Sequence, residues 1–319
     1  MGKGSSSWWE SLESDTLPWL LDTDHPNLLW RALVELVGRP LDSPAVGRAR
    51  GGADAAEPVA TLLSPLRPDG TWELEASPWQ RWDGSAWRII AVAQWGADPT
   101  DPRLCAAIER MLDTDDLALS AVSPCALARW LQAAAELGWG GDPRFEEGVA
   151  RLETRTDSFD PGHWKCVGHD QNDACVVAAV AATGMLAAAP GLRRRPLAEW
   201  AVAGLLRALQ KDGQTPPSQR LRAGHPNLLR TDPLEALWVM GRAAVPFDAA
   251  MAPALGLVQA SQDESARWQR EVTSPDPAGG GRSAGVVSQW VTLRALVALR
   301  HYAEAAALPR RFPERPQRS

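Results

Sequence analysis

The feature that most constrains this chain is repetition, because apolar helical segments recur along nearly its whole length. Within each segment the apolar residues follow the three- and four-residue spacing of one helix face. The last segment illustrates the spacing with Trp290, Leu293, Leu296 and Val297. Repetition of this kind is typical of folds in which each unit packs on its neighbours. The segments expected to form inner helices are 27–37, 85–94, 124–137, 173–188, 233–242 and 286–302.

Second helices are expected between these segments, and no stretch alternates as a half-buried strand does. They are predicted at 45–63, 102–112, 143–152, 195–210 and 249–262. The sequence therefore predicts an all-α fold of about six helical hairpins. Because repeat folds escape the size limit of a single compact core, one domain spanning residues 8–308 is expected. Residues 1–7 and 309–319 are expected to be disordered tails.

Short motifs mark where these helices begin and end. Segments 69–72 and 263–268 each place an Asp after an outer helix and a Trp a few residues later. The Asp-Gly pair at 69–70 supplies a left-handed residue that ends a helix, and the Trp is expected to pack back. Asp232-Pro233 is typical of a helix start. The pentapeptide His-Pro-Asn-Leu-Leu occurs at both 25–29 and 225–229, as equivalent positions in repeats would.

Composition limits the compartment and the partners. The net charge is −6 and the pI is about 5.5, so no basic face for nucleic acid is expected. No apolar run approaches the ~18 residues that a membrane span needs, and the start lacks the apolar core of a signal peptide. The cysteines at 105, 125, 166 and 175 show no CxxC spacing. We therefore expect a cytoplasmic protein with reduced thiols that is not integral to a membrane.

Tryptophan is unusually abundant, with sixteen residues against four Phe and one Tyr. The simplest interpretation is packing at equivalent positions of a repeat. The alternative is a Trp-lined pocket, because the faces of the indole ring attract cations.

The repeat ends resemble degenerate forms of the Gln-Trp repeat of squalene–hopene cyclases, which also marks the β subunits of protein prenyltransferases. The chain is similar, over nearly its whole length, to a small bacterial group of squalene-cyclase-like proteins. The residues that carry the resemblance lie at 17–21, 69–72, 231–237 and 290–296. The resemblance implies an α/α toroid whose inner helices line a central cavity. It does not fix the chemistry, because one fold hosts many functions.

The strongest candidate site lies in residues 163–175, directly before the most apolar inner helix, where two His, two Asp, two Cys and a Trp gather. As a catalytic site, Asp173 or Asp170 would be the acid, His169 its partner, and Trp164 would face a developing cation. The alternative is a polar connector in which both Asp residues are helix caps.

A metal site is a further alternative at the same place. Asp173-Ala174-Cys175 resembles the Asp-x-Cys pair that supplies two zinc ligands in protein prenyltransferases. The third ligand of that family, a His before a later inner helix, has no counterpart in residues 283–290. Zinc would therefore need Cys166 or His169 as a substitute ligand, and no other cofactor is predicted.

Two other acidic sites have two interpretations each, either a catalytic acid or a residue of a turn or helix cap. Asp113-Thr114-Asp115-Asp116 matches the Asp-x-Asp-Asp motif of class II terpene cyclases, in which one Asp protonates an alkene and a neighbouring Asp tunes its acidity. Here it follows an outer helix, which favours a solvated turn. Asp232 begins an inner helix and is expected to cap it, or to act from the rim of the cavity.

These observations lead to three functional hypotheses. The first is a terpenoid-cyclase-like enzyme that uses acid or cation chemistry on a hydrophobic substrate, for example an isoprenoid, in the central cavity. The second is a non-catalytic toroid that binds an apolar ligand or a partner. The third is a zinc-dependent prenyl transferase.

Overall fold

The computed structural model describes residues 16–73, 77–80, 82–113, 122–155, 175–213, 221–272, 284–302 and 305–306, with only the backbone at 211–213. The structure within these ranges is mostly helical, which confirms the all-α prediction. None of the described helices combines the length and the hydrophobicity that crossing a membrane requires.

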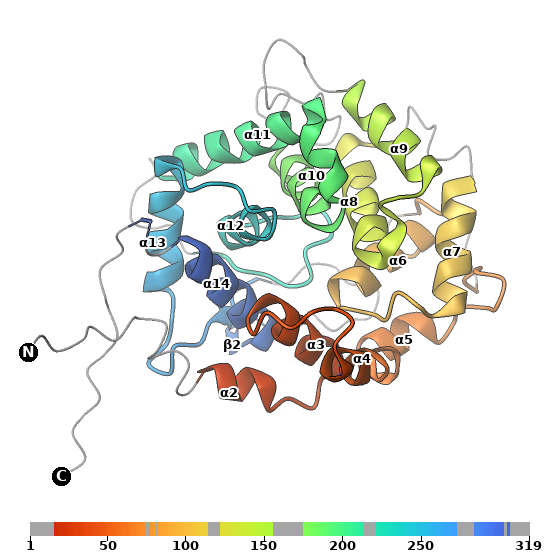
Figure 1. Cartoon of the computed structure of the whole chain (residues 1–319), viewed down its shortest axis with the longest axis horizontal. Coiled ribbons are helices and arrows are strands. Elements are labelled where there is room, and N and C mark those ends of the chain that lie inside the picture. Colours follow the sequence, from red (N-terminus) through yellow and green to blue (C-terminus); the bar gives the residue numbers. More distant parts are fainter. Residues whose placement is uncertain are drawn as a thin grey trace, which may run out of the picture.

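Among the described residues, six inner helices surround a common centre (Figure 1). Helix α10 is apolar on almost all sides, as expected of a helix enclosed by others. In α8 every residue is buried. Each packs against its neighbour in the order α6, α8, α10, α12, α14 and α3. Their bounds are α3 Pro26–Glu35, α6 Ser85–Gln94, α8 Pro124–Ala134, α10 Val176–Ala188, α12 Pro233–Arg242 and α14 Gln289–Tyr302.

The outer helices follow the inner ones in the chain and lie at the periphery in Figure 1. They are α4 Pro44–Arg50, α5 Val59–Leu63, α7 Pro102–Asp113, α9 Pro143–Glu153, α11 Pro196–Gly213 and α13 Ala252–Ala260. Helices such as α9 are amphipathic, and α9 turns Phe145, Val149 and Leu152 toward the interior. The fold thus places one apolar layer of helices inside a second, partly polar layer.

The first and last of the inner helices lie side by side. Helix α14 packs against α3, and the short helix α2 (Thr16–Leu21) precedes them, where the sequence predicted no helix. The Thr16 hydroxyl donates to the Ser265 carbonyl at 3.1 Å, and Arg300 donates to the Leu36 carbonyl. These contacts join residues more than two hundred positions apart, so the two ends of the described chain meet.

The Trp residues at the repeat ends pack back as predicted. Trp72 Nε1 donates to the Leu62 carbonyl at 3.0 Å, and Trp268 Nε1 donates to the Val258 carbonyl at 2.6 Å. Both bonds span ten residues, and both indoles are almost fully buried. The two segments are therefore structurally equivalent. At Gly70, with φ of 78°, a Cβ would meet the Ala106 carbonyl carbon at 2.4 Å, so the turn needs glycine.

Several predicted boundaries are wrong for local reasons. The single helix expected at 45–63 is divided into α4, a 3₁₀ turn (η1, Ala53–Ala55) and α5, because Gly51-Gly52 and Pro58 interrupt it. The helix expected at 249–262 consists of a 3₁₀ turn (η5, Ala249–Met251) and α13.

Two further differences concern inner helices. The helix expected at 124–137 ends at Ala134 and continues as a π turn (η3, Ala135–Trp139), where Gly138 has a φ of 94°. The helix expected at 286–302 begins at Gln289, because β2 (Val286–Val287) pairs antiparallel with β1 (Gln269–Arg270). Another 3₁₀ turn, η4 (Pro190–Arg194), precedes α11.

Candidate functional site

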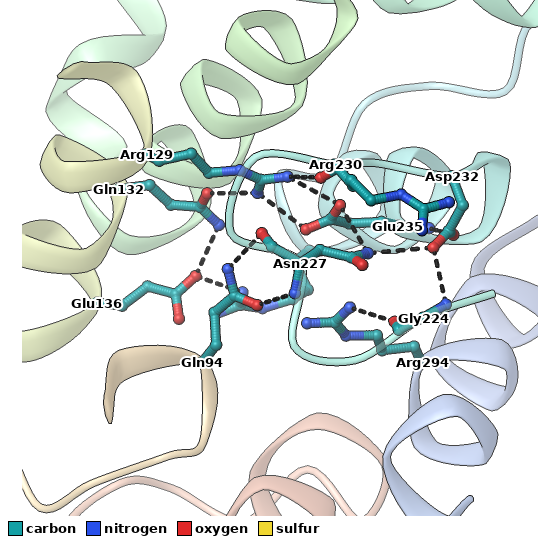
Figure 2. A network of polar contacts seen from close by, with 11 residues as sticks. Gln94, Arg129, Gln132, Glu136, Gly224, Asn227, Arg230, Asp232, Glu235 and Arg294 are labelled. Atoms are coloured by element: carbon teal, nitrogen blue, oxygen red, sulfur yellow. Dashed lines mark hydrogen bonds and ion pairs between the residues drawn. The ribbon is translucent and has the colours of Figure 1, made fainter. Parts of the chain in front are cut away.

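The centre of the molecule is filled by charged side chains. Four arginines and four carboxylates lie there, so their formal charges balance. They come from α3, α8 and the π turn after it, α12 and its N-cap, and α14 (Figure 2 shows part of the network). Their side chains are buried or nearly so. The residues are Arg31, Glu35, Arg129, Glu136, Asp232, Glu235, Arg242 and Arg294.

The innermost ion pair joins α8 to α12. Arg129 Nη1 and Nη2 lie 2.8 and 2.9 Å from the two carboxylate oxygens of Glu235. The two side chains are 0% and 1% exposed. Arg129 also donates to the Arg230 carbonyl at 2.8 Å and to Gln132 Oε1 at 3.1 Å. Such a parallel, charge-assisted pair fixes the relative position of the two helices.

A second group of ion pairs lies nearer the ends of the inner helices. Glu136 accepts from Arg31 at 2.8 Å and from Arg242 at 3.2 Å, and Glu35 lies 3.4 Å from each of these arginines. Burial alone would raise the pKa of Glu136, but Arg242 and Arg31 outweigh it and lower the pKa to about 2. Glu136 is therefore a permanent anion at neutral pH.

An irregular segment, residues 223–228, crosses the centre beside this network (Figure 2). We call it the central segment. It is buried throughout, so its polar groups need partners inside the protein. Gln94 of α6 provides two of them: its Nε2 donates to the Asn227 carbonyl at 2.8 Å, and its Oε1 accepts from Asn227 N at 2.6 Å.

Asp232 holds the central segment against the start of α12. Its Oδ1 accepts from Glu235 N at 2.8 Å, which is the predicted N-cap bond. Its Oδ2 accepts from Gly224 N and from Asn227 Nδ2, both at 3.1 Å. Burial, and then the charge of Glu235, raise the pKa of Asp232 to about 6. The three accepted bonds make this carboxylate a structural clamp.

His225 lies in the central segment between two indole rings. It stacks on Trp290 with ring centroids 4.6 Å apart and meets Trp95 edge-on at 4.5 Å. The imidazole is buried, and within the described part of the chain neither ring nitrogen has a hydrogen-bond partner. Burial lowers its pKa well below 6.5, and the charges of Arg294, Arg270 and Arg31 act in the same direction. His225 is therefore neutral in the folded protein.

The depressed pKa of His225 predicts a loss of stability on mild acidification. The unfolded chain, with a His pKa near 6.5, binds a proton that the folded chain excludes, so stability falls as the pH drops below that value. Between about pH 7.5 and about pH 5.5 this one group accounts for a fall of about 1.4 kcal/mol in the free energy of unfolding. We expect His225→Phe, which keeps a stacked ring, to remove that part of the fall in denaturant titrations.

The matched control is His25→Phe, in the exposed first copy of the same pentapeptide. It should keep the wild-type dependence on pH. Indistinguishable pH profiles for wild type and His225→Phe would contradict a neutral buried imidazole.

A pocket of about 570 Å³ opens where α3, α8, α10 and α14 end. We call it the end pocket. Its charged floor is the group of ion pairs around Glu136, and its walls are largely apolar. Leu41, at 58% exposure, forms part of its rim. The lining residues outside that floor are Trp30, Val34, Leu41, Arg50, Pro99, Ala135, Gly138, Ala187, Ala188, Val297 and His301.

A second pocket, also of about 570 Å³, lies where α3 and α14 begin. Three indoles line it, those of Trp19, Trp95 and Trp290. Asn27 and Arg270 contribute polar groups to the same wall. The predicted Trp-lined pocket thus has a counterpart in the structure.

Most of the predicted catalytic residues cannot be placed. Trp164, His169, Asp170 and Asp173 lie outside the described residues, so the predicted acid–histidine cluster stays a prediction. Asp232 is described, and it caps α12 as one of the two sequence interpretations expected.

The proposed metal ligands and the Asp-x-Asp-Asp motif are also described only in part. Cys166 also lies outside the described residues, whereas Cys175 is buried at the start of α10. Within the described ranges no three His, Cys, Asp or Glu side chains are grouped to hold a metal ion. Asp113 ends α7 and accepts from Arg144 at 2.5 Å, and residues 114–116 are not described.

The central network was not predicted from the sequence. Its members are charged residues within otherwise apolar helices, such as Arg129 in α8 and Glu235 in α12. A charged residue at a fully enclosed position needs a partner, and this was the available signal. The partner itself lies 106 residues away in the chain.

Comparisons with known proteins do not assign a family, since no family model, no curated protein and no solved structure matches the chain. The class that the described structure defines is a mostly helical protein with a charge-balanced centre and a pocket at each end of α3 and α14.

Proposed function

We propose that the chain is an α/α toroid that binds a hydrophobic small molecule in the end pocket without changing it chemically. The toroid is supported by the alternation of inner and outer helices and by the contact between α14 and α3. The observation that carries the binding proposal is the end pocket itself, in which apolar walls stand over an ion-paired floor.

The pocket suits a ligand with a long apolar body and one neutral polar group. Its volume of about 570 Å³ lies in the range of small-molecule sites. Val34, Leu41 and Val297 offer apolar surface to the body. Floor carboxylates and guanidiniums already neutralise one another, so a hydroxyl that donates and accepts suits them better than a further charge. A long-chain alcohol has this chemistry.

The described lining does not favour acid catalysis in this pocket. Protonation of an alkene needs a carboxylic acid that stays protonated in a dry site. Glu136, with a pKa near 2, cannot supply that proton. Asp232, with a pKa near 6, is absent from the end-pocket lining.

Dodecanol is a suitable probe, because binding beside Trp30 is expected to change the tryptophan fluorescence. We expect saturable binding to the wild type. Ala188→Phe places a ring in the pocket and should weaken binding at least about tenfold, which corresponds to about 1.4 kcal/mol.

Ala203→Phe, at a half-buried position on the outer helix α11, serves as the matched control and should bind as the wild type does. Equal affinity in Ala188→Phe would show that the ligand binds elsewhere and would contradict the proposal. Recovery of a chemically altered isoprenoid alcohol would instead favour the terpenoid-cyclase-like alternative, for which the raised pKa of Asp232 is the supporting observation.

A further inference from the structure

The second pocket has features that the proposed function does not use. It lies at the opposite end of α3 and α14 from the end pocket. We infer that it is a separate binding site for a small aromatic carboxylate, whose anionic group lies at the start of α3. This inference is independent of ligand binding in the end pocket.

The start of α3 has no side-chain cap, as is also true of α4, α6 and α10, whereas three other helices have one. Ser123, Asp142 and Asp232 each accept a backbone N–H at the start of their helices. At the N-cap of α3, the His25 side chain accepts none. Helix starts without a cap leave N–H groups that need an acceptor.

Three hydrogen-bond donors at the start of α3 have no acceptor within the described part of the chain. Within the described ranges, the backbone N–H groups of Asn27 and Leu28 donate no hydrogen bond. Asn27 Nδ2 is buried and has no partner there either, although Asn27 is 1% exposed and lines the second pocket. Buried donors without an acceptor are rare in proteins. Their clustering beside a pocket indicates an acceptor that comes from outside the chain.

Electrostatics favours an anion with a single charge. The N-terminal end of a helix of this length carries partial positive charge, which stabilises anions. Arg270 adds a cation to the lining, whereas Glu57, on the exposed side, adds a carboxylate. A monoanionic carboxylate fits this balance better than a phosphate dianion.

The other residues that line the second pocket favour a ligand with a flat apolar ring. Trp95 and Trp290 meet at 5.7 Å in a T-shaped arrangement, and Trp19 lies on the same pocket. Val286 and Val287, at 44% and 42% exposure, form an apolar lip. Aromatic rings pack well against such indole edges and faces. Benzoate is the simplest molecule with both features.

A substitution that provides an N-cap carboxylate from the chain itself tests the inference. In His25→Asp, the new carboxylate can accept the free N–H groups of α3 and should compete with the ligand. Isothermal titration calorimetry of the full chain should show benzoate binding to the wild type, with benzamide and inorganic phosphate at least about tenfold weaker. His25→Asp should weaken benzoate binding at least about tenfold and raise the melting temperature.

His25→Ala is the control, because it removes the same side chain without providing a carboxylate. It should bind benzoate within about threefold of the wild type. Equal binding of benzoate and benzamide, or undiminished binding to His25→Asp, would overturn the inference. No binding of benzoate to the wild type would also overturn it, and would assign the free donors to water.

Discussion

Arg129→Met should lower the free energy of unfolding by about 3–5 kcal/mol, because it leaves the Glu235 carboxylate buried without its partner. Both side chains of this pair are at most 1% exposed, so solvent cannot replace the guanidinium. The substitution also removes the donors to the Arg230 carbonyl and to Gln132. Guanidinium chloride denaturation at neutral pH measures the loss.

Two further variants separate the buried charge from a general effect of removing arginine. Arg144→Met removes solvent-accessible ion pairs with Asp142 and Asp113 and should change the stability far less than Arg129→Met, because water can replace the lost partner. Arg129→Met combined with Glu235→Leu should recover part of the lost stability, since an apolar pair avoids the unpaired charge. A loss below about 1 kcal/mol in Arg129→Met alone would contradict an enclosed, charge-balanced centre.

Trp268→Ala should lower the free energy of unfolding by a similar amount, about 3–5 kcal/mol. The indole is 1% exposed and joins the turn after α13 back to that helix through the Val258 carbonyl. Trp72→Ala, at the equivalent turn after α5, should behave alike, because its indole makes the same ten-residue bond to Leu62. Thermal and denaturant unfolding of both variants provide the comparison.

Trp268→Phe keeps most of the apolar surface and loses only the N–H donor. It should cost about 1–3 kcal/mol, because the Val258 carbonyl loses the short hydrogen bond from the indole and keeps, among the described residues, only that from Ser261 N at 3.3 Å. If Trp268→Ala and Trp72→Ala differed by more than about 2 kcal/mol, the structural equivalence of the two repeat ends would lose its support.

The parts of the fold that local signals determine were predicted well. The bounds of α6 and α12 agree with the prediction, because an apolar run is delimited by turn residues and, in α12, by an Asp-Pro start. The packing of Trp72 and Trp268 also followed from the repeat. By contrast, the interruption of α4 and α5 depends on Gly51-Gly52 and Pro58, whose effect the amphipathic pattern alone concealed.

The candidate site was much less predictable. Asp232 was identified as a cap or rim residue, and the structure gives it three accepted hydrogen bonds. The central ion pairs were not identified, since the partner of Arg129 is more than a hundred residues away. The neutral state of His225 depends likewise on Trp95 and Trp290, which are remote in the chain. Contacts between repeats are set by the global arrangement, which helical periodicity does not specify.

Crystals of the protein soaked with bromododecanol would test the proposed function most directly, because the anomalous scattering of bromine locates the end of the alkyl chain. The proposed function predicts one bromine site in the end pocket, against the apolar wall formed by Val34, Leu41 and Val297. Bromine bound at another site, or an end pocket left unoccupied at a concentration that saturates the fluorescence change, would contradict it.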